Sequence, residues 1–329
     1  MRVMLLPKEL VGLYAPVREE LDQAFEQVSA IWTEVLRLGN GKVDHSPPKA
    51  GGKLLRPALC LLSAGAIGAG DLSRFIPMAA SMEIFHLAAL AHDDVIDGAD
   101  LRRGETTLKA LWNDRAAVLG GDYLVARGMA LLTSYNSCQA VTSVVECMGS
   151  MAEAELADFA LGPWHFSFET CLSLAQRKTA LLFGVVCSTP AYILDGRHRE
   201  SLYRFGLGLG SAFQLVDDLL DLRQEEAILG KPVCGDLMKG KKTLPILFIR
   251  EALEAGDVTR LDSIRGRPLT PEDRKWAAEI LESTGARQRT EAIARQFAHE
   301  ARQALGSLPP SPYKASMEGL AEFVLIRDS

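Results

Sequence analysis

The chain has 329 residues, with 36 Lys and Arg against 42 Asp and Glu, which gives a formal net charge of −6 at pH 7. An apolar fraction of 48% and a charged fraction of 24% are typical of a globular protein. The acidic balance argues against a protein that binds nucleic acid through a basic face. No run of 18 or more apolar residues predicts a membrane span, and we expect no signal peptide.

Apolar residues recur at three- and four-residue spacing through most of the chain, which is the pattern of helices. The pattern predicts helices over residues 8–38, 53–69, 72–97, 114–136, 138–162, 167–194, 198–222, 244–254, 271–284, 286–306 and 311–327. Gly- and Pro-rich segments separate many of them. No linker divides the chain into two compositional blocks. We therefore expect one all-α domain, a single large helical bundle, over residues 1–329.

Two of these helices are apolar almost all round, at Met78–Leu90 and Ala180–Ala191. Such helices belong at the centre of a bundle, where an unpaired carboxylate is expensive. Two D-D-x-x-D motifs nevertheless follow apolar helical runs, HDDVID and VDDLLD. Their members are Asp93, Asp94, Asp97, Asp217, Asp218 and Asp221.

The spacing within each motif brings its carboxylates together on one helix face, because residues i and i+4 are displaced by only about 40° around the axis. Carboxylates that close repel one another unless cations or protons neutralise them. Oxygen ligands in this number suit Mg²⁺, which commonly bridges to phosphate oxygens. One D-D pair alone would be a solvated charge cluster, but two copies at the ends of buried helices favour a metal–diphosphate site.

A diphosphate also needs cationic donors. Candidates in loops, at helix starts or inside an apolar helix are Lys53, Arg56, Arg102, Arg103, Lys178, Lys231 and Lys241. His86 lies two helical turns before Asp93 on nearly the same face. It is either a hydrogen-bond donor to a phosphate or a residue of the packed core. Gln214 precedes Asp217 by three residues and shares the face of the second motif.

These motifs, in order, resemble the trans-isoprenyl diphosphate synthases of the polyprenyl synthetase family, of medium- to long-chain type. The resemblance runs from GGKLLRP through HDDVID, LRRG, QRKTA and FQLVDDLLD to GKPVCGDLMKGKKTLP, about residues 50–245, with a similar last helix. It implies an all-α homodimer whose helices surround a central active-site cavity. It also implies the head-to-tail condensation of isopentenyl diphosphate with an allylic diphosphate, giving a trans product. The cytoplasmic location is expected on separate grounds, from the exclusions above and from six cysteines that form no C-x-x-C pair.

The resemblance assigns roles residue by residue. Asp93, Asp97 and Asp217 are the main Mg²⁺ ligands, supported by Asp94, Asp218 and Asp221, with three ions when diphosphate is bound. Isopentenyl diphosphate is held by Lys53, Arg56, His86 and Arg103. The allylic diphosphate is held by Arg102, Lys178, Thr179, Gln214, Lys231 and Lys241. Leu54 departs from the family, in which many relatives carry arginine there.

Product length is predicted from the helix before the first motif. In the family, a large aromatic residue at the fifth position before the motif stops the chain early, and here that position is Ala88, followed by Ala89. Phe85 lies about 5 Å further along the helix. It is either a residue that stops the growing chain deeper in the cavity or a residue of the packed core. We therefore expect a product of twenty carbons or more.

Four alternatives remain. A class I terpene cyclase normally changes the second motif and lacks the isopentenyl diphosphate set. A non-catalytic subunit of a heteromeric prenyl synthase would typically have lost aspartates. A di-iron bundle would need a second motif like Glu83-x-x-His86 and two further glutamates. Finally, Gly206-x-Gly208-x-Gly210 resembles a nucleotide loop, but no strand precedes it, so helix packing explains it better.

Overall fold

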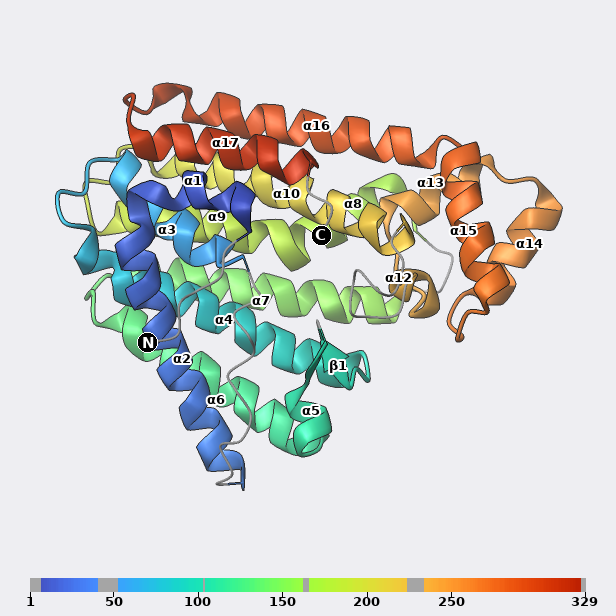
Figure 1. Cartoon of the computed structure of the whole chain (residues 1–329), viewed down its shortest axis with the longest axis horizontal. Helices are drawn as coiled ribbons and strands as arrows, with labels where there is room; N and C mark the ends of the chain where they lie inside the picture. The colour runs from blue at the N-terminus through green and yellow to red at the C-terminus, as the bar shows by residue number, and fades with distance from the viewer. Residues whose placement is uncertain (1–6, 41–52, 103, 162–165, 224–233, 327–329) are drawn as a thin grey trace. The chain divides into compact units, whose positions relative to one another are not determined.

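The computed structural model describes residues 7–40, 53–102, 104–161, 166–223 and 234–326, which form helices over most of their length (Figure 1). This confirms the predicted all-α class. Contacts within the chain divide it into two compact units. The first comprises Met1–Val144, Val185–Tyr203 and Leu305–Leu320, and the second comprises Val145–Gly184, Arg204–Ala304 and Ala321–Ser329. The expectation of one domain over the whole chain stays a prediction.

The first unit is built on α4 (Ile76–Ile96), which packs against α2 (Arg18–Asn40), α3 (Leu55–Ala66) and α6 (Asp114–Thr133). Its remaining elements begin with α1 (Lys8–Tyr14), η1 (Ala15–Val17), η2 (Leu72–Phe75) and α5 (Leu108–Leu111). Later elements are η4 (Thr189–Tyr192) and η5 (Leu305–Ser307). Among the described residues, four helices begin in one unit and end in the other, namely α7 (Cys138–Ala160), α9 (Leu181–Ser188), α10 (Arg199–Arg223) and α17 (Pro312–Ile326).

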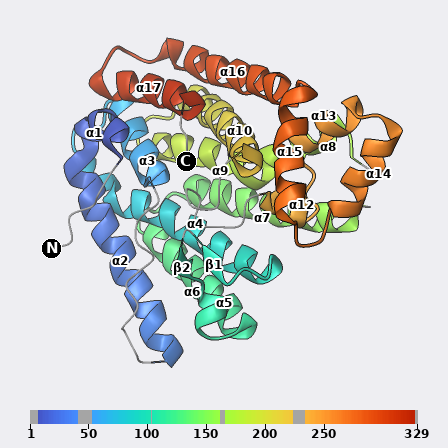
Figure 2. The ribbon, with the colours of Figure 1, turned by 45° about the vertical axis from the view of Figure 1, so that its right-hand side comes forward.

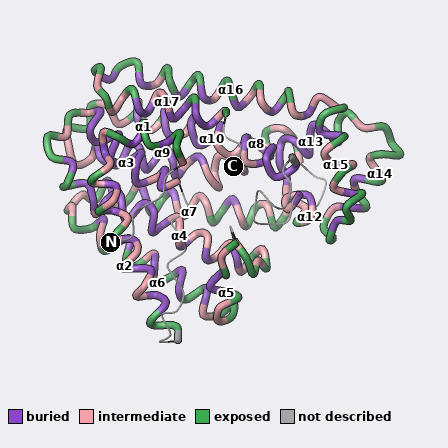
Figure 3. The backbone as a smooth tube through the Cα atoms, in the orientation of Figure 1, coloured by how far each residue is buried: buried purple, intermediate pink, exposed green. Residues whose placement is uncertain are grey.

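Helix α4 is buried along most of its length, as its all-round apolar sequence predicts (Figure 3). Pro77, near its start, suits a position where no intrahelical N–H bond is needed. By length and composition alone Leu72–Ile96 could cross a membrane, but 67% of its most apolar window is buried inside the protein. That burial is what the core helix of a globular protein shows.

A small antiparallel hairpin follows α4 where the sequence suggested only a loop (Figure 2). Strand β1 (Leu101–Arg102) pairs with β2 (Glu105–Thr106), Leu101 opposite Thr106 and Arg102 opposite Glu105. Gly104 takes a φ of 78°, a conformation that glycine adopts without steric cost. Two-residue strands are too short to show alternation, so periodicity could not predict them.

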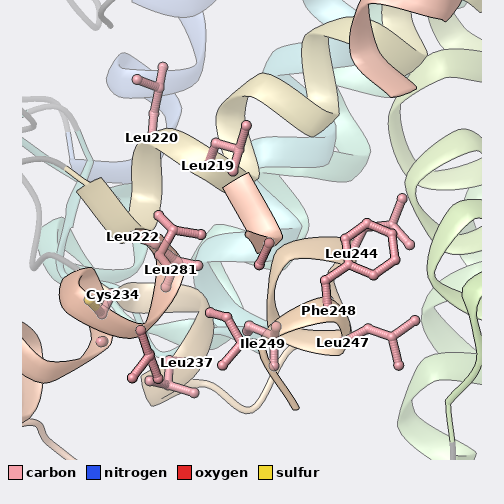
Figure 4. Packing of buried hydrophobic residues seen from close by; sticks show 14 of the residues in the cluster. Leu219, Leu220, Leu222, Cys234, Leu237, Leu244, Leu247, Phe248, Ile249 and Leu281 are labelled. Carbon is pink, nitrogen blue, oxygen red and sulfur yellow. The ribbon is translucent and has the colours of Figure 1, made fainter. Parts of the chain in front are cut away.

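The second unit surrounds α13 (Leu244–Ala252), which packs against α8 (Phe168–Ala175), α15 (Pro271–Ser283) and α16 (Ala286–Ala304). Leu244, Leu247, Phe248 and Ile249 of α13 point into a buried cluster shared with Leu219 and other residues of α10 (Figure 4). The unit also contains the π-helical turn η3 (Gln176–Ala180), the first half of α9, α12 (Gly235–Met238) and α14 (Ala255–Ile264). This core supports the C-terminal half of α10, which carries the second aspartate motif.

The glycines of α10 are packing residues. A Cβ on Gly206 would lie 2.3 Å from the Phe183 carbonyl oxygen, and one on Gly210 would lie 2.6 Å from Ala180 Cα. A Cβ on Gly208 would lie 2.9 Å from the Phe297 carbonyl oxygen of α16. These distances confirm that close helix packing, and not a nucleotide loop, explains the three glycines.

Gly206→Ala therefore destabilises the protein by about 1–3 kcal/mol or more, because the added methyl meets backbone that cannot move aside cheaply. Urea denaturation measures the change. Gly12→Ala in α1 is the matched control, since a Cβ there meets nothing within 4 Å and alanine is the better helix former. Equal midpoints for Gly206→Ala and the wild type would contradict this packing.

Candidate active site

The first aspartate motif ends α4. Asp94 is 5% exposed, and its Oδ1 accepts a hydrogen bond from Arg102 Nε of β1 at 2.7 Å. Asp97 caps the helix, and its N–H donates to the Asp93 carbonyl at 2.8 Å. The side chains of Asp93 and Asp97 are half-buried. The hairpin therefore brings a guanidinium onto the middle carboxylate of the motif.

Two faces of α4 differ in exposure before the motif. His86, Ala89 and Asp93 are half-buried, whereas Ala88 is 1% and Phe85 3% exposed. The Phe85 ring packs on α6, because a Cβ on Gly128 would lie 2.7 Å from its Cε1 atom. His86 and Asp93 are thus exposed to a similar degree, as expected for residues on one face of the helix. Phe85 is buried with the core residues.

The second motif is tied into a chain of hydrogen bonds within the second unit. Asp218 Oδ1 accepts from Gln214 Nε2 at 2.7 Å, and Gln214 Oε1 accepts from Thr179 Oγ1 at 2.7 Å. Thr179 and Gln214, predicted to bind the allylic diphosphate, are therefore connected to Asp218, predicted to be a supporting metal ligand. Asp218 and Asp221 are buried, at 4% and 2% exposed, and Asp217 is half-buried.

A fourth carboxylate, Asp236 of α12, joins this motif. The Asp236 N–H donates to Asp221 Oδ2 at 2.9 Å, and the Asp236 carboxylate pairs with Lys241 Nζ at 3.1 Å. Burial raises the pKa of Asp218 well above its ordinary value, and the nearby carboxylates of Asp236 and Asp217 raise it further. The motif is thus a place where added positive charge is strongly favoured.

Lys178, Thr179 and Arg177 lie on the π-helical turn η3, which interrupts the helix predicted over 167–194. Lys178 Nζ is 2.7 Å from Asp158 Oδ2 and 3.0 Å from Glu155 Oε1, both on α7. Arg177 donates to Glu153 Oε2 at 2.6 Å. Single π turns are frequent at functional sites. Here the turn carries three consecutive polar side chains, each with a partner on α7 or α10.

Lys53 stands at the entrance to α3, where its carbonyl accepts a hydrogen bond from the buried Tyr14 hydroxyl at 2.8 Å. Leu54 follows with a φ of 42° and is 3% exposed. Arg56 is half-buried in the first turn of the helix. Leu54, the expected departure from the family, is therefore a buried leucine in a left-handed conformation.

Arg103 and Lys231 lie outside the described residues. Conversely, the structure adds three residues that the sequence assignment missed: Asp158, Asp236 and Lys242. Asp236 and Lys242 lie within the motif GKPVCGDLMKGKK, so their place in the motif was a signal. Nothing in the sequence signalled Asp158, because a single aspartate near the end of a helix is usually a solvated surface residue.

These side chains fit a divalent cation by the type of their donor atoms. In the described part of the chain, no three His, Cys, Asp or Glu side chains gather in an arrangement that could hold a metal ion. The donors at both motifs are carboxylate oxygens, which are the ligands that Mg²⁺ and Ca²⁺ prefer. Because Mg²⁺ is usually held by one or two carboxylates together with phosphate oxygens and waters, the donor set fits.

Comparison with known proteins decides the family. The Polyprenyl synthetase family profile matches residues 43–281, which is more than half of the chain. The chain belongs to the polyprenyl synthetase family. Heptaprenyl diphosphate synthase component 2 from Bacillus subtilis (strain 168) is 34% identical over 285 residues, covering 84% of this chain and 79% of the relative. Octaprenyl diphosphate synthase from Escherichia coli (strain K12) is 30% identical over 340 residues, covering 98% and 97%.

A solved structure supports the same assignment. A polyprenyl synthase from Caulobacter crescentus CB15, complexed with calcium and isoprenyl diphosphate, matches with a TM-score of 0.88 and 29% identity over 100% of both chains. The resemblance, the isoprenoid synthase fold and the enzyme class, a transferase that makes polyprenyl diphosphates, are thereby confirmed. The di-iron alternative is set aside by this family membership.

Proposed function

We propose that this polyprenyl synthetase condenses isopentenyl diphosphate with an allylic diphosphate, 1'-4 head-to-tail and trans, and releases diphosphate. The observation that carries the proposal is the pair of D-D-x-x-D motifs at the ends of buried helices, the second hydrogen-bonded through Gln214 to the turn that bears Lys178. The product has twenty carbons or more, in line with relatives named as heptaprenyl and octaprenyl synthases. We further propose that one cytoplasmic domain over residues 1–329, without a membrane span, carries the activity.

Mg²⁺ is the proposed cofactor, with three ions when diphosphate is bound. Asp93, Asp97 and Asp217 would be the main ligands, with Asp94, Asp218 and Asp221 in support. When bound, Mg²⁺ supplies Lewis-acid stabilisation of the negative charge that develops on the leaving diphosphate. The calcium in the C. crescentus complex supports a divalent cation in the family.

The chain's own side chains bind and orient the two substrates. Lys178, Thr179, Gln214, Lys231, Lys241 and Arg102 would hold the allylic diphosphate, and Lys53, Arg56, His86 and Arg103 the isopentenyl diphosphate. Arg102 already pairs with Asp94 at 2.7 Å, so it would serve both a carboxylate and a phosphate. The apolar α4 would exclude water, which would otherwise quench an allylic cation to an alcohol. By family resemblance the departing diphosphate takes the proton, so no side-chain base is assigned.

The proposed reaction is tested by incubating the protein with isopentenyl diphosphate, Mg²⁺ and each allylic primer in turn, then measuring the product by mass spectrometry. We expect a prenyl diphosphate of twenty carbons or more with at least one primer. A cyclic hydrocarbon formed from the primer alone would favour the terpene cyclase alternative. No product with any primer would favour the non-catalytic subunit.

Helix α7 supports the proposed homodimer. Val145, Gly149, Ala152, Leu156 and Phe159 follow one another at spacings of four and three residues, and all five are exposed. Leu156 is 70% and Phe159 92% exposed. Apolar and small residues at this spacing form the seam of paired helices. A second copy of this chain is the proposed occupant, whereas the B. subtilis relative is named as one component of an enzyme.

Leu156→Glu combined with Phe159→Glu should convert the dimer to a monomer, because like charges would then face each other across the seam. Light scattering after size-exclusion chromatography measures the mass. Glu279→Ala, on the exposed face of α15, is the control that should stay dimeric. A monomeric wild type, or a double variant that remains dimeric, would contradict the proposed interface.

Product length should respond to the half-buried face of α4. Ala89→Phe places a ring on the face that carries His86 and Asp93, so we expect shorter products at unchanged stability. Ala88→Phe is the comparison, since Ala88 is 1% exposed and a ring there overpacks the core, costing about 1–3 kcal/mol or more. Mass spectrometry of the products and thermal melting measure the two effects. Unchanged product length in a folded Ala89→Phe variant would contradict this assignment.

A further inference from the structure

Lys242 is a buried lysine next to the assigned Lys241. Its side chain is only 6% exposed, whereas that of Lys241 is 43% exposed. Lysine is almost never fully buried unless it is paired, so a buried ammonium needs specific partners. Lys242 Nζ donates to Asp158 Oδ1 at 2.6 Å and to the Asp158 backbone carbonyl at 3.0 Å.

Asp158 is shared between two lysines. Its Oδ1 faces Lys242, and its Oδ2 accepts from Lys178 Nζ at 2.7 Å. Burial pushes the pKa of Asp158 upward, but the hydrogen bonds from Lys178 and Lys242 outweigh it, and the pKa lies below its ordinary value. The carboxylate is therefore ionised at neutral pH and bridges the two ammonium groups.

We propose that Lys242 is a positioning residue for the allylic diphosphate, which acts through Asp158 on Lys178. The inference rests on the proposed function, in which Lys178 binds that diphosphate. Lys242 fixes Asp158 by two hydrogen bonds, one to the side chain and one to the backbone. Asp158 in turn holds the Lys178 ammonium at the π-helical turn.

The balance of charges around Asp158 explains how Lys242 would influence Lys178. Lys178 also pairs with Glu155, so two lysines face two carboxylates in this cluster. Without Lys242, Lys178 would be the one lysine paired with both carboxylates, and the Arg265 guanidinium, which also interacts electrostatically with Asp158, would compensate only part of the lost charge. Asp158 would then bind the Lys178 ammonium more tightly, and its uncompensated charge would repel an incoming diphosphate. Lys242 thus leaves Lys178 able to share its charge with the substrate.

The test compares Lys242→Met, Lys242→Arg, Asp158→Asn and the double variant Lys242→Met/Asp158→Asn. Initial rates give kcat and the separate KM values for farnesyl diphosphate and isopentenyl diphosphate, and thermal melting reports folding. Lys275→Met is the matched control, because Lys275 is 80% exposed and pairs only loosely with Glu279 at 3.9 Å. Should methionine prevent folding, Lys242→Gln replaces it, since an amide still donates to Asp158.

Lys242→Met should raise the KM for farnesyl diphosphate about tenfold to a hundredfold and that for isopentenyl diphosphate less than about twofold. Arginine should restore most of the affinity. Adding Asp158→Asn to Lys242→Met should lower the raised KM again, because the uncompensated carboxylate is gone. A structural role alone predicts instead that the melting temperature and both KM values change together.

Three results would overturn the inference while the wild type remains active. They are a wild-type KM in Lys242→Met, equal increases in both KM values, and failure of Asp158→Asn to rescue the double variant. A wild type that makes no prenyl product would instead overturn the proposed function, and the inference with it.

Discussion

Replacing Asp217 by alanine should lower the turnover about a hundredfold to a thousandfold while the protein stays folded. Asp217 is the half-buried carboxylate of the second motif. In the proposed function Asp217 is a ligand of the cation that stabilises the leaving diphosphate, so its loss should remove several kcal/mol of stabilisation at the transition state. Because the side chain is not sealed in the core, its truncation leaves no large cavity.

The choice of Asp217 over its neighbours follows from their contacts. Asp218 accepts a hydrogen bond from Gln214, and Asp221 accepts one from the Asp236 N–H, so alanine at either position would also disturb buried structure. Steady-state kinetics with thermal melting measures the effect, with Asp257→Ala on the exposed face of α14 as the control. Wild-type turnover in Asp217→Ala would rule out the metal-ligand assignment.

Lys178→Met should lower kcat/KM for the allylic diphosphate about tenfold to a hundredfold, the worth of one charge-assisted hydrogen bond. Its ammonium lies between Asp158 and Glu155, at 2.7 and 3.0 Å, and is 25% exposed. A group so placed can exchange one carboxylate contact for a phosphate oxygen. The same kinetic assay, run with varied isopentenyl diphosphate, should show little change in that KM.

Lys178→Arg is the informative companion. A guanidinium is larger and planar, and therefore cannot reproduce the short contacts to both carboxylates from the π-helical turn. We expect it to recover only part of the lost kcat/KM. If Lys178→Met raised both KM values equally, Lys178 would not be specific to the allylic diphosphate.

Periodicity predicted the long helices closely, because their apolar spacing is the direct cause of their packing. The helix predicted over 114–136 is found at Asp114–Thr133, and that over 138–162 at Cys138–Ala160. Helix α14 was missed because its sequence, AGDVTRLDSI, buries only Leu261 and Ile264. Two apolar anchors are too few to give a periodic signal.

In the candidate site, too, features within one helix could be predicted from the sequence, and contacts between elements could not. Spacing along one helix placed His86 on the half-buried face of Asp93, since both lie on a single regular element. Contacts between elements could not be predicted in this way. Arg102 reaches Asp94 only because the β1–β2 hairpin follows the end of α4, and Lys242 meets Asp158 across 84 positions of sequence. A lysine in the segment GKK gives no sign that it is buried.

Diphosphate binding tests the central claim most directly. The claim is that the two D-D-x-x-D motifs, each with three carboxylates, bind an anion through a divalent cation, although the chain itself has a net charge of −6. Inorganic diphosphate is titrated calorimetrically into the wild type and into the Asp93→Ala/Asp217→Ala variant, with and without Mg²⁺. Binding should require Mg²⁺ and be lost in the folded double variant. Binding that is independent of Mg²⁺, or unchanged in the double variant, would contradict the account.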